Sequence, residues 1–154
     1  MIVISTSRDP SQRTRSFCKV IARFMNWRYI QRGKKGIEEL INEHPEIILV
    51  REIKGNPAFL DFYRKGRKIA TWRINVGIIK KEKMDDSHVC FAGRVPFNPL
   101  MLGALPDNRA GKKFALKMKP KKIVYFRKGV EMDFRYDGKR VLTVKVVRVY
   151  ESED

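Results

Sequence analysis

A loop rich in hydroxyl groups and arginine carries the residues of this chain that are best suited to chemistry. An apolar run ends in Ser5, Ser7 and Arg8, and a helical pattern that includes Arg13 and Arg15 follows. Such a loop can aim backbone N–H groups, hydroxyl groups and guanidinium forks at one anion. We therefore expect a site for a phosphate group or a nucleic-acid backbone, with ordinary capping of the helix as the alternative.

The helix after this loop has a clear start, one apolar stripe and one basic face. Asp9 reads as its N-cap, followed by a proline at the first helical position, and Asn26 reads as its end. The apolar positions at helical spacing are Phe17, Val20, Ile21, Phe24 and Met25. Arg15, Lys19 and Arg23 recur every four residues and share another face, which would extend an anion site along the helix.

The charge of the chain indicates a polyanionic partner. The 154 residues hold 34 Lys+Arg against 17 Asp+Glu, a formal net charge of +17. Residues 1–77 carry 16 basic and 7 acidic side chains, and the other half carries 18 and 10, so the excess is spread through the folded body. Such a field attracts nucleic acids. A solvated, highly charged surface is the alternative, although heat-adapted surfaces of that kind pair Glu with Lys.

The candidate RNA contacts lie in the loop, on the helix and in two lysine-rich segments. They are Ser5, Ser7, Arg8, Arg13, Arg15, Lys19, Arg23, Lys34, Lys35, Lys112, Lys113 and Lys117. About six phosphate contacts on single-stranded RNA would give a salt slope near −4, from roughly −0.7 per phosphate. Tyr29, Phe59, Tyr63 and Trp72 could stack bases, but most occupy alternating strand positions, which favours core packing.

Apolar periodicity predicts a mixed α/β fold with helices packed on the sheet. The expected elements are strands 2–6, 27–30, 46–53, 58–64, 68–79, 88–92, 123–128, 130–136 and 141–150, with helices from the loop to Asn26, over 37–43 and 99–105, and within the basic segment 108–120. The apolar run 47–50 favours a strand covered on both faces. The apolar phase shifts between Val146 and Val147, which predicts a β-bulge.

The length favours a single domain over residues 1–154. The charged segment 80–87 is the predicted linker between two halves, 1–79 and 88–150. The first half alternates strands and helices, the second is richer in strand, and no sharp repeat is visible between them.

Residue sets typical of catalysis are missing from the sequence. His44 and His88 stand alone in it, the loop lacks the glycines and lysine of a Walker loop, and no metal, nucleophile or redox motif occurs. Cys18 and Cys90 are too few for a disulfide framework, which indicates a reducing compartment. No apolar run reaches the roughly 18 residues of a membrane span, and no signal-peptide pattern is visible. We expect a cytoplasmic protein that is not an enzyme, without cofactor or metal.

Three motifs resemble the Brix domain, in particular its compact archaeal form. They are Ile-Ser-Thr-Ser-Arg-Asp-Pro-Ser over 4–11 before a basic helix, Glu-x-x-Gly-x-Pro over 52–57 between strands, and Asp-Phe-Arg-Tyr over 133–136. The resemblance runs over nearly the whole chain. It departs at 66–72, where longer eukaryotic members have Gly-Pro-Thr-Ala-aromatic, and at 95–107, which is compressed here.

The resemblance implies a fold of two similar α/β halves, akin to the anticodon-binding domain of some aminoacyl-tRNA synthetases. Brix proteins are ribosome-biogenesis factors that bind precursor ribosomal RNA and are not known as enzymes. The implied role is non-catalytic RNA binding in precursor rRNA processing or small-subunit assembly in an archaeal cytoplasm. The alternative is a protein-interaction module that docks on ribosomal or pre-ribosomal proteins. An RNA-acting enzyme would need a metal site or an acid–base pair that the sequence does not display.

Overall fold

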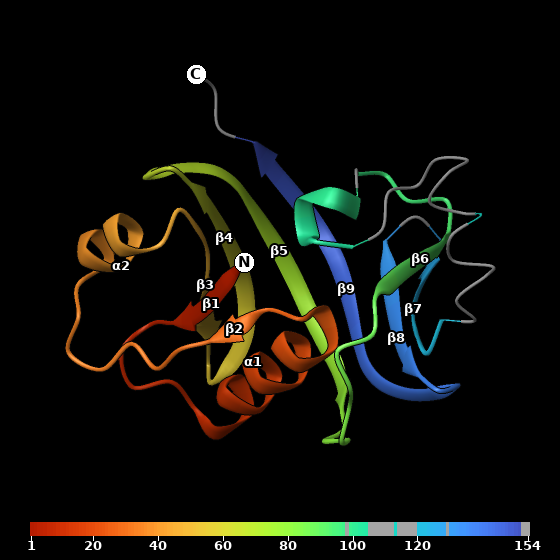
Figure 1. Ribbon diagram of the computed structural model, residues 1–154. Coiled ribbons are helices and arrows are strands. Elements are labelled where there is room, and N and C mark those ends of the chain that lie inside the picture. The colour runs from red at the N-terminus through yellow and green to blue at the C-terminus, as the bar shows by residue number, and fades with distance from the viewer. Residues whose placement is uncertain (98, 105–112, 114–119, 129, 152–154) are drawn as a thin grey trace.

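Strands form one curved nine-stranded sheet in the computed structural model, which describes residues 1–97, 99–104, 113, 120–128 and 130–151 (Figure 1). The first elements are β1 (Val3–Thr6), α1 (Gln12–Met25), β2 (Arg28–Tyr29), α2 (Ile37–Glu43), β3 (Glu46–Ile53), β4 (Asn56–Arg64) and β5 (Arg67–Ile79). The others are β6 (Val89–Gly93), the 3-10 helix η1 (Pro99–Leu102), β7 (Lys122–Arg127), β8 (Glu131–Tyr136) and β9 (Lys139–Glu151). The predicted mixed α/β fold is confirmed.

The strand order is β2-β1-β3-β4-β5-β9-β8-β7-β6. β5 and β9 pair antiparallel at the centre, so the N-terminal and C-terminal parts of the chain share one sheet. The predicted linker 80–87 lies in the non-strand connection from β5 to β6. Among the described residues, no helix is long and apolar enough to cross a membrane.

The two parts of the sheet have the same strand pattern. In each part a parallel pair, β1 with β3 or β6 with β7, is followed by two antiparallel neighbours. A short local similarity in sequence accompanies this pattern. Leu60-Asp61-Phe62 and Met132-Asp133-Phe134 occupy the middle of β4 and β8, and each triplet is followed by a two-residue turn. Both turns, Lys65-Gly66 and Asp137-Gly138, have two positive φ angles, as a type I′ hairpin requires.

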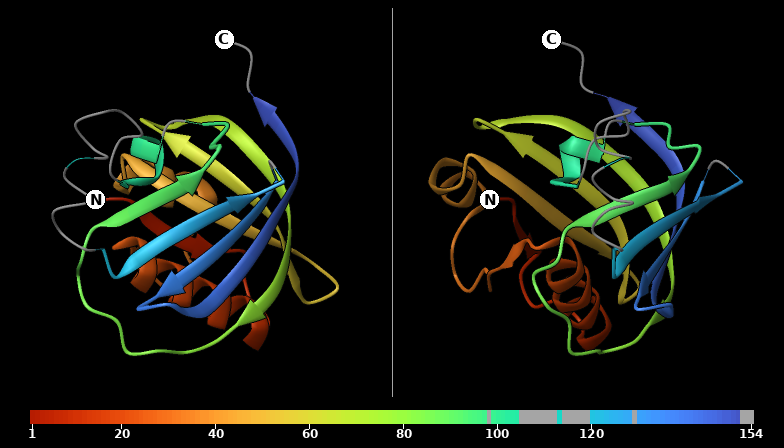
Figure 2. Two further views of the ribbon diagram at one scale, coloured as in Figure 1. Left: turned by 90° about the vertical axis from the view of Figure 1, so that its right-hand side faces the viewer. Right: turned by 45° about the vertical axis from the view of Figure 1, so that its right-hand side comes forward.

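The sheet curls around α1 (Figure 2). All five residues of the predicted apolar stripe of this helix are buried in the main core, and Asn26 ends the helix in the left-handed conformation as predicted. The predicted N-cap was wrong by two residues. Ser11 caps α1 because its hydroxyl accepts a hydrogen bond from the Thr14 amide at 3.2 Å, whereas Asp9 lies in the loop with φ of 50°.

Helix α2 covers the opposite face of the sheet near β3. Its Leu40 is fully buried in a second cluster with Val3, Ile47 and Leu49. Neighbouring β3 residues such as Ile48 point into the main core instead. The prediction that β3 is covered on both faces is therefore confirmed.

The strands of the C-terminal part lie within two residues of their predicted bounds. Arg148 pairs with Arg73 and Val146 with Ile74, which leaves Val147 unpaired and confirms the predicted bulge. The segment predicted as a helix over 99–105 forms only η1. The predicted helix within 108–120 lies almost entirely outside the described residues.

Candidate nucleic-acid interface

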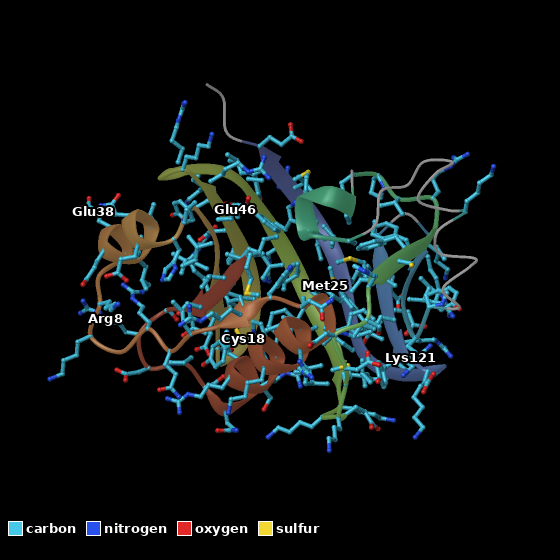
Figure 3. The ribbon with its side chains drawn as sticks, in the orientation of Figure 1. Arg8, Cys18, Met25, Glu38, Glu46 and Lys121 are labelled. Atoms are coloured by element: carbon cyan, nitrogen blue, oxygen red, sulfur yellow. The ribbon has the colours of Figure 1, made fainter. Side chains whose placement is uncertain are left out.

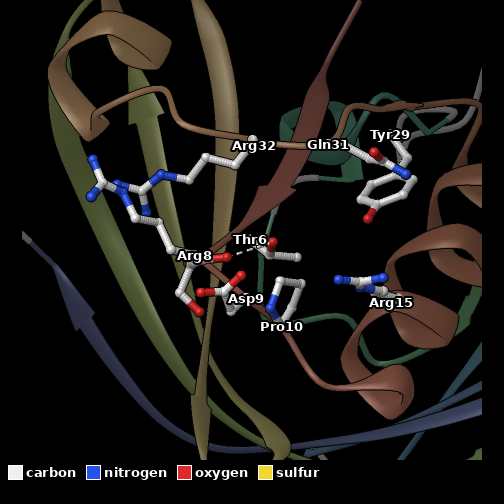
Figure 4. A pocket seen from close by; sticks show the side chains of 10 residues that line it. Thr6, Arg8, Asp9, Pro10, Arg15, Tyr29, Gln31 and Arg32 are labelled. Atoms are coloured by element: carbon white, nitrogen blue, oxygen red, sulfur yellow. Dashed lines mark hydrogen bonds between the residues drawn. The ribbon is translucent and has the colours of Figure 1, made fainter.

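A pocket of about 130 Å³ lies where the loop leaves β1. Its lining comes from the loop, the first turn of α1 and the end of β2, and consists of Thr6, Ser7, Arg8, Asp9, Pro10, Arg15, Tyr29, Gln31, Arg32 and Gly33 (Figure 4). β1 and β2 are parallel, so their carboxyl ends meet at one edge of the sheet. Ligands in α/β sheets bind typically at this edge. The loop predicted to hold an anion thus forms a concave site.

The pocket is basic. Arg8, Arg15 and Arg32 line it together with the single acidic side chain of Asp9. Within the described part of the chain, none of these three arginines forms an ion pair. The Arg32 Nε donates to the backbone oxygen of Lys35 at 2.9 Å, which orients that side chain. Unneutralised guanidinium groups around a cavity favour an anionic ligand.

Hydroxyl donors supplement the arginines. The side chains of Ser7 and Tyr29 line the pocket, and in Figure 4 the Tyr29 hydroxyl faces Arg15. Burial and the nearby Cys18 raise the pKa of Tyr29, although Arg15 acts in the opposite direction. The phenol therefore stays protonated at neutral pH and can donate a hydrogen bond.

Ser5 does not belong to this site. It is fully buried, and its hydroxyl donates to the backbone oxygen of Ile30 at 2.9 Å, which fastens β1 to the segment after β2. The Ser7 N–H is occupied as well, since it donates to the backbone oxygen of Val50 at 3.1 Å. The arginine and hydroxyl side chains of the lining are the groups placed to hold an anion in the pocket.

The basic residues of α1 diverge. Arg15 lines the pocket, whereas Arg13 donates to the backbone oxygens of Val76 and Gly77 in β5 at 2.8 and 2.9 Å. Arg23 pairs with Asp86 at 2.9 Å. Lys19 is exposed on the same helix.

The lysine candidates are dispersed. Lys34 and Lys35 lie in the loop next to the pocket, and Lys35 pairs with Glu43 at 2.7 Å. Lys113 is exposed, while Lys112 and Lys117 lie outside the described residues. Figure 3 shows Arg8 and Lys121, at the end of the second lysine-rich segment, on opposite sides of the molecule.

The cysteines and His44 do not line the pocket. Burial raises the pKa of both Cys18 and Cys90, so neither is a ready nucleophile. His44 lies 3.9 Å from Glu43 at the end of α2. Among the described residues, no group of three or more His, Cys, Asp or Glu side chains could hold a metal ion. The arginine and hydroxyl groups of the pocket lining suit an anionic ligand.

Comparison with known proteins identifies the family. No model of a known protein family matches. A curated protein from Archaeoglobus fulgidus, described as a probable Brix domain-containing ribosomal biogenesis protein, is 39% identical over 152 residues, covering 99% of each chain. This chain belongs to the Brix domain family of ribosomal biogenesis proteins.

Solved structures show the same fold. The crystal structure of Mil, an archaeal Imp4-like protein, matches this Brix chain with a TM-score of 0.71 at 23% identity, covering 99% of this chain and 100% of Mil. The structure of a probable ribosomal biogenesis protein from Aeropyrum pernix K1 matches with a TM-score of 0.61 at 18% identity, covering 99% of this chain and 97% of that one.

Two of the Brix motifs meet at the start of α1. The Ser11 hydroxyl donates to the backbone oxygen of Gly55 at 2.7 Å, and the Ser11 amide donates to Oε1 of Glu52 at the same distance. Although burial alone would raise the pKa of Glu52, hydrogen bonds from Thr14 and Ser11 lower it overall. The turn after β3 thereby fixes the helix whose first turn supplies Arg15 to the pocket.

Sequence reasoning missed Gln31 and left Arg32 out of the site. Both follow β2, a strand of only two residues, so little in the local pattern marks them. The pairing of the strands could have indicated them, because the residues that follow two adjacent parallel strands, here β1 and β2, lie side by side. Trp72 is buried, as core packing predicted, and contacts Phe62 and Phe97.

Proposed function

We propose that this Brix protein is a non-catalytic RNA-binding factor of ribosome biogenesis that acts on precursor ribosomal RNA, in its processing or in small-subunit assembly, in the cytoplasm. The observation that carries the proposal is the pocket at the end of β1, which Arg8, Arg15 and Arg32 line without an ion-paired carboxylate among the described residues. The family relationship supplies the ribosomal context.

The pocket suits a phosphate of a nucleic-acid backbone. Guanidinium groups bind phosphate oxygens through two parallel hydrogen bonds. The hydroxyls of Ser7 and Tyr29 can add neutral donors from the same lining. Such contacts position RNA without reading its bases, so selectivity would come from RNA shape or from unpaired loops.

The repeated strand pattern supports the proposal that the chain consists of two similar halves, 1–79 and 88–150. Asp61 in β4 and Asp133 in β8 are each almost fully buried, and each accepts hydrogen bonds from arginine. With the identical turn conformations that follow, this favours a duplicated α/β unit of the anticodon-binding type. In this interpretation the pocket at β1 belongs to the N-terminal unit.

The decisive experiment compares charge-matched variants. Arg8→Gln/Arg15→Gln removes two pocket charges, and Lys80→Gln/Lys81→Gln removes two exposed charges from the linker. Binding to a precursor ribosomal RNA fragment and to a random RNA of equal length is measured across a salt series. The pocket variant should flatten the salt slope by about 1.4, from roughly 0.7 per lost phosphate, while the linker variant stays near wild type.

Equal, salt-sensitive binding of both RNAs would leave only a basic surface without a ribosomal target. Weak, salt-insensitive binding of both would contradict RNA binding and favour a module that docks on pre-ribosomal proteins. RNA cleavage that one carboxylate substitution abolishes would contradict a non-catalytic role.

A further inference from the structure

A row of arginine and aromatic side chains crosses the outer face of the sheet, which is the face opposite α1 (Figure 2). Register places Arg51 of β3 opposite Phe59 of β4, Phe59 opposite Arg73 of β5, and Arg73 opposite Arg148 of β9. These four residues, called the arginine rung below, lie on four adjacent strands about 4.8 Å apart. The rung therefore spans roughly 14 Å across the sheet.

The guanidinium groups of the rung lie over aromatic rings. The guanidinium carbons of Arg51 and Arg73 lie 4.2 and 5.1 Å from the centre of the Phe59 ring. The guanidinium carbon of Arg148 lies 5.4 Å from the ring of Tyr150, its neighbour on the outer face. Planar cations stacked on aromatic rings form a flat surface on which bases can stack.

The positive charge of the rung is only partly neutralised within the described residues. Arg51 is neutralised by Asp61, to whose two oxygens it donates at 2.6 and 3.1 Å. Arg73 and Arg148 face each other across β5 and β9, and neither forms an ion pair within the described residues. Like charges opposite each other destabilise a sheet, and an anionic ligand would offset that cost.

The β-bulge aims Arg148 at this face. Val147 is the extra residue, so Arg148 and Tyr150 fall on the outer side while Val149 lies opposite the core residue Trp72. Without the bulge, the alternation of β9 would turn Arg148 toward the inner face. The bulge thus completes the rung.

Arg51 and Arg148 of the rung are exposed, whereas Phe59 and Arg73 are half-buried. The Arg51 side chain is 48% exposed and Tyr150 is also 48% exposed, whereas α1 lies on the other side of the sheet (Figure 2). Arg51 directly follows Val50, whose backbone oxygen accepts the amide of the pocket residue Ser7. The β3 end of the rung therefore directly follows the strand position that binds the pocket loop.

We propose that the arginine rung, with Tyr150, is a second binding surface for single-stranded RNA, along which a strand held in the pocket crosses the sheet from β3 to β9. This inference rests on the proposed function for the identity of the ligand. An unpaired strand fits better than a duplex, because stacking on Tyr150 and on guanidinium planes needs exposed base faces. The aromatic rings also favour RNA over an acidic protein.

The test uses Arg73→Gln/Arg148→Gln, with Lys80→Gln/Lys81→Gln as the charge-matched control and Arg8→Gln/Arg15→Gln as the pocket variant. The probes are an oligouridylate of about 12 nucleotides and a duplex RNA of equal length. At about 0.1 M salt, the loss of two phosphate contacts should weaken oligouridylate binding on the order of 10- to 30-fold. Tyr150→Leu should weaken it at least about 5-fold through lost stacking, and duplex binding should change less.

Other results would overturn the proposal. If the rung variant binds oligouridylate like the linker control while the pocket variant is weakened, the outer path is wrong and the pocket function stands. If both the rung and the pocket variants match the control, both proposals fail. Equal losses on single strand and duplex would contradict the stacking surface. Unchanged RNA binding with loss of an acidic pre-ribosomal protein would assign the rung to a protein partner.

Discussion

The backbone amide of Ser11 donates a hydrogen bond of 2.7 Å to the carboxylate of Glu52, 41 residues further along the chain. This contact joins the N-terminus of α1 to the end of β3. It adds to the local cap that the Ser11 hydroxyl, and not Asp9 as the sequence suggested, provides. The direction of α1, and with it the position of Arg15 at the pocket, therefore depends on a long-range carboxylate.

Replacing Glu52 by Gln should destabilise the protein by about 1–2 kcal/mol at neutral pH, because a charge-assisted acceptor becomes a neutral one. The folded state lowers the pKa of Glu52, so its contribution is present above the ordinary value of 4.5 and is lost as the pH falls further. Urea unfolding at several pH values should show that the free energy of unfolding falls less steeply with decreasing pH in Glu52→Gln than in the wild type. The exposed linker residue Glu82, changed to Gln, is the control, and an identical acid loss in both variants would contradict this role.

Asp133 should be the most sensitive carboxylate of the sheet. It is 1% exposed and lies within 3.3 Å of the guanidinium groups of Arg127, Arg135 and Arg140. Burial would raise its pKa, but the hydrogen bonds and charges of Arg140 and Arg135 lower it overall. Asp133→Asn should cost about 2–4 kcal/mol of unfolding free energy. Asp61→Asn, which affects one arginine, should cost about half as much. Equal losses of unfolding free energy in Asp133→Asn and Asp61→Asn would contradict the expectation that the number of arginine partners sets the cost.

Local periodicity was sufficient to predict most of the fold. The buried stripe of α1 and the bulge at Val147 follow from spacing alone, because side-chain direction repeats every 3.6 or 2 residues. The similarity around Asp61 and Asp133 is not apparent in the sequence, because it is short and shares few identical residues. Only the common strand pattern made it recognisable.

The candidate site was harder to predict, because its geometry depends on contacts between distant residues. Ser5 lies outside the site because its hydroxyl donates to the carbonyl of Ile30, 25 residues away. Arg32 lies in the site because it follows the two-residue strand β2. Arg13 and Arg15 differ by two positions on a helix and so point in different directions. Residue type and charge identified the region, but pairing across the sheet decided which side chains meet.

Lys122 should give the protein an unusual rise in stability at alkaline pH. Its amine is buried and donates to the backbone oxygen of Arg23 and to Oδ1 of Asn26 at the end of α1. Burial lowers its pKa from 10.5 to about 8, with Asp85 opposing the shift. Between these two values the unfolded state binds more protons, so stability rises with pH across the window. Lys122→Met should flatten the dependence of Tm on pH from 8 to 10; an unchanged slope would contradict the assignment.

Substitution of Arg13 should affect mainly the stability of the protein, and substitution of Arg15 should affect mainly its RNA affinity. Arg13→Ala removes two hydrogen bonds to the β5 carbonyls of Val76 and Gly77, so it should lower the unfolding free energy by about 1 kcal/mol. Its effect on RNA affinity should be small. Arg15→Ala should keep the Tm of wild type and weaken RNA binding about 5-fold at 0.1 M salt, the effect of roughly one phosphate contact. Paired measurements of Tm and of RNA affinity on the two single variants check both expectations. The reverse pattern, with Arg13→Ala weakening RNA binding at unchanged Tm, would move the site from the pocket to the β5 side of the helix.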